Sequence, residues 1–167
     1  MRSLSSFAVL LLAAVALAGC GDEAPMEPPP PQELTRDAIG YFCNMTVVEH
    51  KGPKGQIFLT DQAQPLWFTS VRDTLAFTML PGEPKNIAAI YVTDMGRASW
   101  DAPEPGTWID ARTAFYVLGS DRVGGMHSPE AVPFSRKADA EQFVERHGGE
   151  VVDFRTIPPA SILESAD

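Results

Sequence analysis

The sequence has few cysteines, an excess of acidic over basic side chains, and no apolar run long enough to span a membrane. It holds two cysteines, and 13 Lys and Arg against 22 Asp and Glu, for a net charge of −9. Two cysteines cannot build the disulfide framework of a small secreted domain, and a chain this acidic lacks the basic stripe of a nucleic-acid-binding protein. No Cys-x-x-Cys pair, P-loop or dinucleotide fingerprint is present. We therefore expect no nucleic-acid partner and no zinc or nucleotide site of the familiar kinds.

The N-terminal end is typical of an exported lipoprotein. Phe7 to Ala18 is an unbroken apolar run of twelve residues, shorter than the ~20 residues of a spanning helix but suited to a signal peptide. The run ends in Leu17-Ala18-Gly19-Cys20, which resembles a bacterial lipobox. That resemblance implies a signal peptide over residues 1–19, lipid on Cys20, and a membrane-anchored protein facing the periplasm. The alternative is an ordinary signal peptide that happens to contain a cysteine.

A proline-rich segment follows. Five of the seven residues from Pro25 to Pro31 are proline, which excludes a helix interior or a central strand and favours an extended, semi-rigid spacer. We predict that residues 20–33 form a lipid-anchored tether that holds the folded part away from the membrane.

The remaining chain predicts an α+β fold with two similar small ββαβ-type halves in one compact unit, over residues 34–98 and 99–167. Phe68-Thr69 and Phe77 recur 66 residues later as Phe134-Ser135 and Phe143. Each copy combines strand-like runs with a helix that ends at a glycine. Expected strands cover 56–60, 87–93, 113–118 and 151–154, and expected helices begin after Ser70 and Ser135 and end before Gly82 and Gly148.

Cys43 is the one thiol left free if Cys20 carries lipid. In an oxidising compartment a lone thiol is a buried inert residue, an intermolecular disulfide or a reactive group, so a homodimer is also compatible with the sequence. Met45 stands two residues on, which lets a thiolate and a thioether approach one ion. Such soft ligands select Cu(I).

Met126 follows two glycines, which allow a sharp turn or a close approach of the backbone. A methionine on a glycine-rich loop is less suited to the core than Met79 or Met95, which stand within or beside expected regular elements. We therefore expect Met79 and Met95 in the core and treat Met126 as a second candidate ligand, with the core as its alternative.

Several short motifs occur together over nearly the whole mature chain. They are the lipobox, Phe42-Cys43-Asn44-Met45, Glu49-His50 with Gly52-Pro53-Lys54-Gly55, Trp67-Phe68 with Ser70-Val71-Arg72-Asp73, Asp94-Met95-Gly96, and Gly124-Gly125-Met126 with Pro129-Glu130-Ala131-Val132-Pro133-Phe134. Jointly they resemble the NosL family, lipid-anchored copper chaperones that serve the maturation of nitrous oxide reductase. One departure is visible, because Asn44 stands where the family usually has glycine; Asn tolerates left-handed backbone better than most residues.

The resemblance implies Cu(I) bound outside the cytoplasm by Cys43, Met45 and Met126, with His50 as a weaker candidate ligand. It also implies delivery of copper to nitrous oxide reductase or its membrane assembly complex, without enzymatic activity. Two alternatives remain open. One is a thiol-dependent enzyme that uses Cys43 with His50 as its base. The other is a metal-free, membrane-tethered adaptor with Trp67, Trp100 and Trp108 as contact residues.

Overall fold

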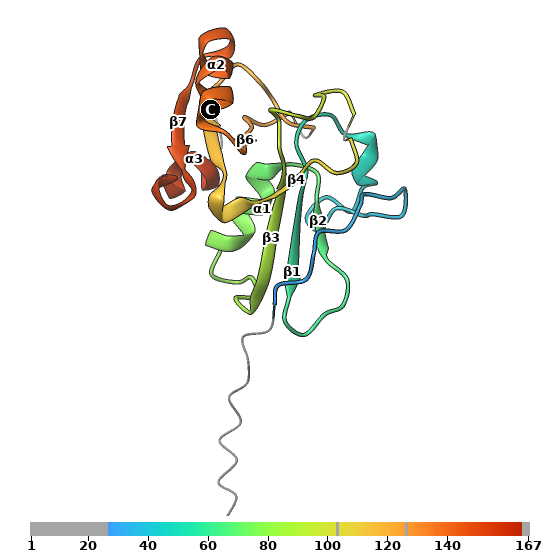
Figure 1. The fold of residues 1–167 in the computed structure, drawn as a ribbon. Helices are drawn as coiled ribbons and strands as arrows, with labels where there is room; N and C mark the ends of the chain where they lie inside the picture. Colours follow the sequence, from blue (N-terminus) through green and yellow to red (C-terminus); the bar gives the residue numbers. More distant parts are fainter. Residues whose placement is uncertain (1–26, 103, 126, 165–167) are drawn as a thin grey trace, which may run out of the picture.

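Two small antiparallel β-sheets, each with a helix after its second strand, form the fold (Figure 1). The computed structural model describes residues 27–102, 104–125 and 127–164. The first sheet contains β1 (Gly55–Leu59), β2 (Leu66–Phe68), β3 (Ile87–Thr93) and β4 (Trp108–Asp110), and the second contains β5 (Phe115–Leu118), β6 (Val132–Phe134) and β7 (Glu150–Asp153). The helices are α1 (Val71–Met79), α2 (Lys137–His147) and α3 (Pro159–Leu163), with 3-10 turns η1 (Val47–Glu49), η2 (Ala111–Thr113) and η3 (Phe154–Thr156).

The two sheets repeat one topology. Their strand orders are β2-β1-β3-β4 and β6-β5-β7, so the first strand of each half is central and the strand after the helix pairs on its other side. Equivalent residues also pair in the same way, since Gly55 faces Phe68 and Phe115 faces Phe134. This confirms the expected α+β class with two ββαβ-type halves. The chain changes sheet after Asp110, rather than after residue 98 as the expected boundary implied, because β4 pairs with β3.

The helix boundaries follow local capping chemistry in one half and a tertiary contact in the other. The Ser70 side chain accepts a hydrogen bond from the Asp73 N–H, as expected of an N-cap. The same role predicted for Ser135 is wrong. Its hydroxyl donates to Asp94 Oδ2 at 2.6 Å and its N–H to Asp94 Oδ1 at 3.0 Å. Gly148 ends α2 with φ +70°, a conformation that glycine adopts without a steric penalty.

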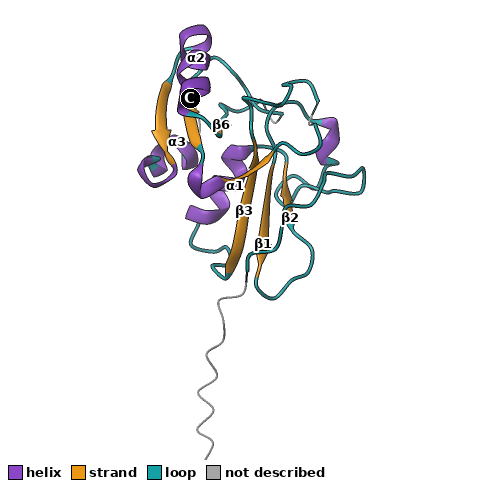
Figure 2. Cartoon of the chain, in the orientation of Figure 1, coloured by secondary structure: helices purple, strands orange, loops and turns teal. Residues whose placement is uncertain are grey.

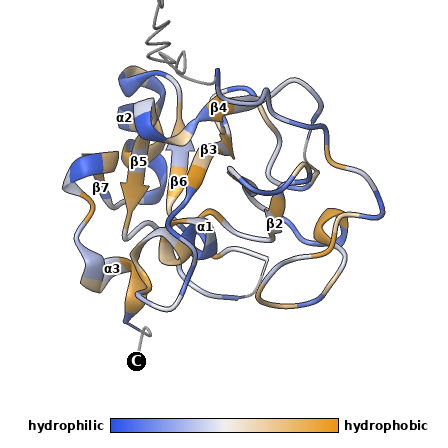
Figure 3. Cartoon of the chain, turned by 90° about the horizontal axis from the view of Figure 1, so that it is seen from below, coloured by the Kyte–Doolittle hydropathy of each residue, from blue (hydrophilic) through white to orange (hydrophobic). Residues whose placement is uncertain are grey.

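Two apolar clusters form the core: the larger takes buried residues from both sheets, whereas the buried residues of the smaller all belong to the second half. The strands β3 and β5 are coloured as largely hydrophobic in Figure 3. Side chains alternate along β5, so Tyr116 and Leu118 enter the larger cluster between the halves, while Val117 enters the smaller one under α2. Met79 packs against the larger cluster and Met95 against the smaller one, which confirms the expectation that both belong to the core.

Four elements were not expected from the sequence: β2, β4, β6 and α3. The three strands have three residues each and α3 has five, which is too short for a periodic pattern to stand out. β6 even contains Pro133, and proline is tolerated there because β6 lies at the edge of its sheet.

The last residues of the expected tether lie along the first sheet. The Pro29 carbonyl accepts a hydrogen bond from Tyr91 OH at 2.8 Å, and Gln32 exchanges two hydrogen bonds with the Gln56 side chain. The expected signal peptide and Cys20 lie outside the described residues. Within the part of the chain that is described, no helix is long and apolar enough to cross a membrane.

Candidate metal centre

Cys43 lies in a tight loop between Gly40 and Met45. The Gly40 N–H donates to the Met45 carbonyl at 2.8 Å, and the Asn44 N–H donates to the Gly40 carbonyl at 2.9 Å. Asn44 has φ +54°, the left-handed conformation that Asn tolerates better than most residues. The residue that departs from the family pattern therefore still closes the turn.

The thiol is half-buried and is held from two sides. Its Sγ lies 3.6 Å from Thr69 Oγ1. On the other side it packs against Gly40, where an added Cβ would lie 2.5 Å from Sγ. Glycine is needed at this position because the sulfur occupies the space of a side chain.

Exposed apolar side chains flank Cys43 in the sequence. Ile39, Tyr41, Phe42 and Met45 have exposed fractions of 47%, 40%, 39% and 38%; we call these four residues the apolar rim. The Tyr41 and Phe42 rings pack edge-on with centroids 5.2 Å apart, and both contact Phe68 and Phe77 beneath them. The rim is thus anchored on the core while the Met45 side chain remains accessible from outside.

His50 follows η1 and lies beside the second candidate loop. Its Nδ1 is 3.2 Å from the Gly125 carbonyl oxygen, across 75 residues of sequence. An added Cβ on Gly125 would lie 2.5 Å from His50 Cβ, so the two backbones approach closely. With Nδ1–H donating to this carbonyl, Nε2 keeps its lone pair for a metal.

The second candidate loop runs from Val123 to Pro129, which form an isolated β-bridge at its base. The Gly124 N–H donates to the Ser128 carbonyl at 2.9 Å, and the His127 N–H donates to the Gly124 carbonyl at 3.0 Å. Met126, the predicted ligand, lies outside the described residues, but Gly125 and His127 on either side of it are described.

The two loops meet at the start of α1. Thr69 contacts the Cys43 thiol, and its neighbour Ser70 lies under Gly124, where an added Cβ would be 3.6 Å from Ser70 Cβ. In Figure 2 the long loops gather beside one end of the strands β1 and β3. Among the described residues, no three His, Cys, Asp or Glu side chains are grouped so as to hold a metal.

Two charged residues that no sequence pattern singled out, Lys54 and Glu130, are buried near these loops. Lys54 Nζ donates to the carbonyls of Lys51 at 2.9 Å and Gly52 at 2.6 Å. Glu130 Oε1 accepts from the N–H groups of Arg72 and Ala131, both at 2.9 Å. Burial raises the pKa of Glu130 to about 8 and lowers that of Lys54 to about 8, while their mutual attraction opposes both shifts.

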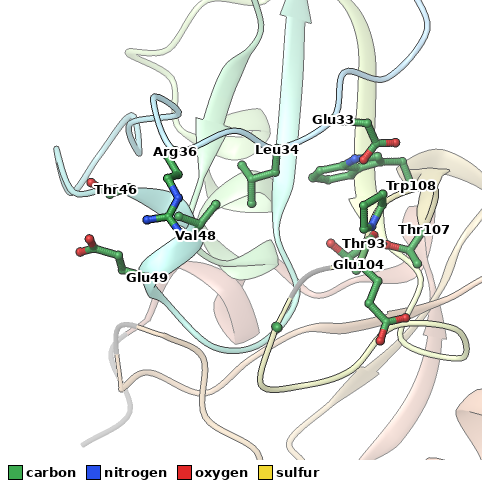
Figure 4. Close-up of a pocket in the computed structure, with 12 residues that line it drawn as sticks. Glu33, Leu34, Arg36, Thr46, Val48, Glu49, Thr93, Glu104, Thr107 and Trp108 are labelled. Carbon is green, nitrogen blue, oxygen red and sulfur yellow. Dashed lines mark hydrogen bonds between the residues drawn. The ribbon is translucent and has the colours of Figure 1, made fainter.

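A pocket of about 590 Å³ flanks η1 (Figure 4). Figure 4 shows the Glu33 carboxylate near Trp108, the Glu104 carboxylate pointing away from that ring, and Glu49 with Arg36 on the opposite side. None of the described residues that line it has a sulfur-containing side chain. Its lining residues Thr46 and Glu49 are the chain neighbours of the candidate ligands Met45 and His50.

Comparison with known proteins places this geometry in a family. The family model described as NosL matches residues 31–162. The copper-binding lipoprotein NosL of Achromobacter cycloclastes is 45% identical over 157 residues, which is 93% of this chain and 81% of that protein. The protein of the same name from Stutzerimonas stutzeri is 32% identical with the same coverage.

Two solved structures are also similar. The crystal structure of the copper chaperone NosL from Shewanella denitrificans matches with a TM-score of 0.74 and 33% identity, covering 79% of this chain and 99% of that one. The solution structure of apo-NosL from Achromobacter cycloclastes matches with a TM-score of 0.51 and 45% identity, covering 68% and 94%. With the family model matching most of the chain and relatives of 45% and 32% identity, the chain belongs to the NosL family.

Proposed function

We propose that this chain is an exported, lipid-anchored chaperone that binds copper as Cu(I) and delivers it for the assembly of the copper centres of nitrous oxide reductase. Its relatives are named as copper-binding lipoproteins and as a copper chaperone. The observation that carries the proposal is the contact of the Cys43 thiol with Thr69, whose chain neighbour Ser70 packs under Gly124 of the loop that carries Met126.

In this proposal Cys43 provides most of the binding energy as a thiolate. Met45 and Met126 add neutral thioether donors, which favour Cu(I) over harder ions. His50 is a further ligand through Nε2, with its ring oriented by the Gly125 carbonyl. Such a backbone contact on the other ring nitrogen is the usual support of a metal-binding histidine.

Release of copper requires that an acceptor reach the ion. The apolar rim leaves the Met45 side chain 38% exposed and the thiol half-buried. An acceptor can therefore approach from the rim side and replace the ligands one at a time. We propose nitrous oxide reductase or its membrane assembly complex as that acceptor, and a lipid on Cys20 that holds the chaperone at the periplasmic face of a membrane.

The two alternative functions have less support. A thiol-dependent enzyme needs a base beside Cys43, but the polar side chain that contacts Sγ is the hydroxyl of Thr69, which is not a base. An adaptor would need free tryptophans. Trp67 and Trp108 pack on each other with centroids 6.0 Å apart, and Trp100 lies under the Arg122 guanidinium.

Anaerobic Cu(I) titration tests the proposal. The mature lipoprotein in detergent should bind Cu(I) tightly, and Cys43→Ser should lower the affinity by more than about 100-fold, because it removes a first ligand rather than a supporting group. Met79→Leu, which changes a core methionine, is the matched control and should bind like the unchanged protein. Stoichiometric binding by Cys43→Ser at unchanged affinity would refute the proposal.

A further inference from the structure

We propose that Glu83, from the loop between α1 and β3, is a positioning residue for the Cys43 thiol and acts through the hydroxyl of Tyr41. The Tyr41 hydroxyl donates to Glu83 Oε2 at 2.9 Å, across 42 residues of sequence. This inference rests on the proposed function, because it adds a supporting residue to the site that would hold copper. Glu83 would act on that site through Tyr41 and not as a ligand.

Tyr41 is part of the loop that carries the thiol, and it is held at three points. Its N–H donates to the Trp67 carbonyl at 2.7 Å. Its ring packs against Phe68 and Phe77, with centroids 5.9 Å and 5.3 Å away. The backbone and the ring are thus fixed on β2 and α1, and the hydroxyl adds the third point at Glu83.

The place of Tyr41 determines how the sulfur is held, because its chain neighbour Gly40 packs against the thiol. An added Cβ on Gly40 would lie 2.5 Å from Cys43 Sγ. Gly40 also closes the loop, since its N–H donates to the Met45 carbonyl and its carbonyl accepts from the Asn44 N–H. A displacement of Tyr41 would therefore move a residue that both packs on the sulfur and closes the loop.

The loop that carries Glu83 is itself fixed to the end of α1. The Glu83 N–H donates to the Leu80 carbonyl at 3.3 Å. The ammonium group of Lys85 donates to the carbonyls of Thr78 at 3.0 Å and Leu80 at 2.6 Å. The last carbonyls of a helix lack partners within it and favour a cation nearby. Glu83 therefore offers Tyr41 an acceptor on a well-held support.

The Cys43 loop is supported from both ends of α1. Before the helix, Thr69 Oγ1 lies 3.6 Å from Cys43 Sγ. Beyond the helix, Glu83 accepts from Tyr41. The nine residues of α1 span about 13 Å, so the two supports are well separated. Two separated contacts restrict rotation of the loop as well as its displacement, whereas one contact would leave it able to pivot.

Tyr91 provides a matched control. Its hydroxyl donates to the Pro29 carbonyl at 2.8 Å, again across a long stretch of sequence. Tyr91 lies on β3, and its ring packs against Phe58 of β1. Its side-chain contacts are thus with the first sheet and the N-terminal segment. A tyrosine that acts only on stability should resemble Tyr91, whereas a positioning residue should change the reactivity of Cys43.

The test measures alkylation of Cys43 by iodoacetamide in the metal-free mature lipoprotein in detergent, followed by peptide mass spectrometry. We expect Tyr41→Phe and Glu83→Ala each to speed alkylation by about 2- to 10-fold, the equivalent of one net hydrogen bond, because the sulfur is held less firmly. Tyr91→Phe should keep the rate, whatever its thermal stability. Cu(I) affinity, measured by competition with a chromophoric chelator, should fall by a similar factor in the first two variants and stay unchanged in Tyr91→Phe.

The double variant shows whether the two residues act as a unit. If Glu83 acts through Tyr41, the variant that combines Tyr41→Phe with Glu83→Ala should be alkylated no faster than either single variant, because both changes remove one interaction. Multiplied effects would overturn the inference. Unchanged alkylation rates in the two single variants would overturn it as well.

Glu83→Gln separates the hydrogen bond from the charge. Glutamine removes the negative charge but keeps a carbonyl oxygen that can accept from the Tyr41 hydroxyl. Its alkylation rate should therefore stay close to that of the unchanged protein. A rate as high as that of Glu83→Ala would show that the charge of Glu83 acts on the thiol directly, and this would contradict a positioning role.

Because these rates are measured without copper, they test the inference separately from the proposed function. Weak binding of Cu(I) by the unchanged protein would refute the proposed function and leave the alkylation results unaffected. A Cys43 thiol whose reactivity does not respond to Tyr41→Phe or Glu83→Ala would refute the inference, even in a protein that binds Cu(I) tightly.

Discussion

The Sγ atom of Cys43 lies 3.6 Å from the hydroxyl of Thr69, the residue directly before the N-cap of α1. The equivalent residue of the second half, Ser135, donates instead to Asp94. At this position of the internal repeat, the residue of the first half contacts the thiol, whereas the residue of the second half joins the two halves through Asp94.

Removal of the Thr69 hydroxyl should weaken the copper site slightly. Thr69→Val keeps the shape of the side chain but loses the contact to Sγ, so we expect a loss of Cu(I) affinity of about 2- to 10-fold, the equivalent of one net hydrogen bond. Chelator competition measures it. Thr78→Val, whose hydroxyl donates to the Leu75 carbonyl, should leave the affinity unchanged. An affinity for Thr69→Val as low as that of Cys43→Ser would contradict this reading.

A side chain at position 40 should move the thiol. An alanine there would place its Cβ 2.5 Å from Sγ. The same Cβ would lie 3.2 Å from Thr69 Cγ2, so it would have little room to shift. We expect Gly40→Ala to lower Cu(I) affinity and to speed alkylation of Cys43, because the sulfur is pushed outward. Iodoacetamide kinetics on the metal-free protein report the second effect. Equal alkylation rates in Gly40→Ala and the unchanged protein would show that the sulfur does not depend on this glycine.

The left-handed conformation of Asn44 predicts a rank order of stability. Asn44→Gly should be neutral, whereas Asn44→Val should cost about 1–2 kcal/mol, because a β-branched residue is strained at φ +54°. For a domain of this size each kcal/mol lowers Tm by about 2–4 °C, which calorimetry can resolve. If Asn44→Val has the same Tm as the unchanged protein, the turn is not held in this left-handed conformation.

The buried Glu130 should make stability depend on pH. Its pKa is raised by burial from 4.5 to about 8 in the folded chain, where Lys54 opposes the shift and Asp73 adds to it. A raised carboxyl pKa means that the folded state holds the proton more tightly. This contribution is complete below about pH 4.5 and is lost as the pH rises to about 8. Burial lowers the pKa of Lys54 from 10.5 to about 8, so this residue makes stability depend on pH between those two values, above the window of Glu130.

Urea unfolding of the metal-free protein at pH 5 and pH 8 measures this effect. The free energy of unfolding should fall over that interval in the unchanged protein, and Glu130→Gln should reduce the fall. Asp94→Asn serves as the matched variant of a second buried carboxylate. The same pH dependence with and without Glu130 would show that its carboxyl group does not titrate in this range.

Much of the fold could be predicted because its signals are local or repeated. Residues 87–93 form β3 with the expected bounds, and the spacing of 66 residues between Phe68 and Phe134 marks equivalent ends of β2 and β6. Ser135 could not be predicted correctly, since its hydroxyl is recruited by Asp94 from 41 residues away. Such a contact leaves no local pattern.

The candidate site also contains some residues that could be predicted from the sequence and others that could not. Cys43 could be singled out as a lone thiol, and Asn44 as a residue able to close a left-handed turn. The approach of His50 to Gly125 could not be predicted, because it depends on how the two halves pack. Nor could the burial of Lys54 and Glu130, since such residues almost always lie at the surface.

The central claim is that Cys43 and Met126, from loops far apart in the sequence, hold one Cu(I) ion. X-ray absorption on the selenomethionine-labelled, Cu(I)-loaded protein tests it most directly. We predict a copper–selenium contact at bonding distance that weakens in Met126→Leu and persists in Met79→Leu. A spectrum without copper–selenium scattering, or one that Met126→Leu leaves unchanged, would contradict the account.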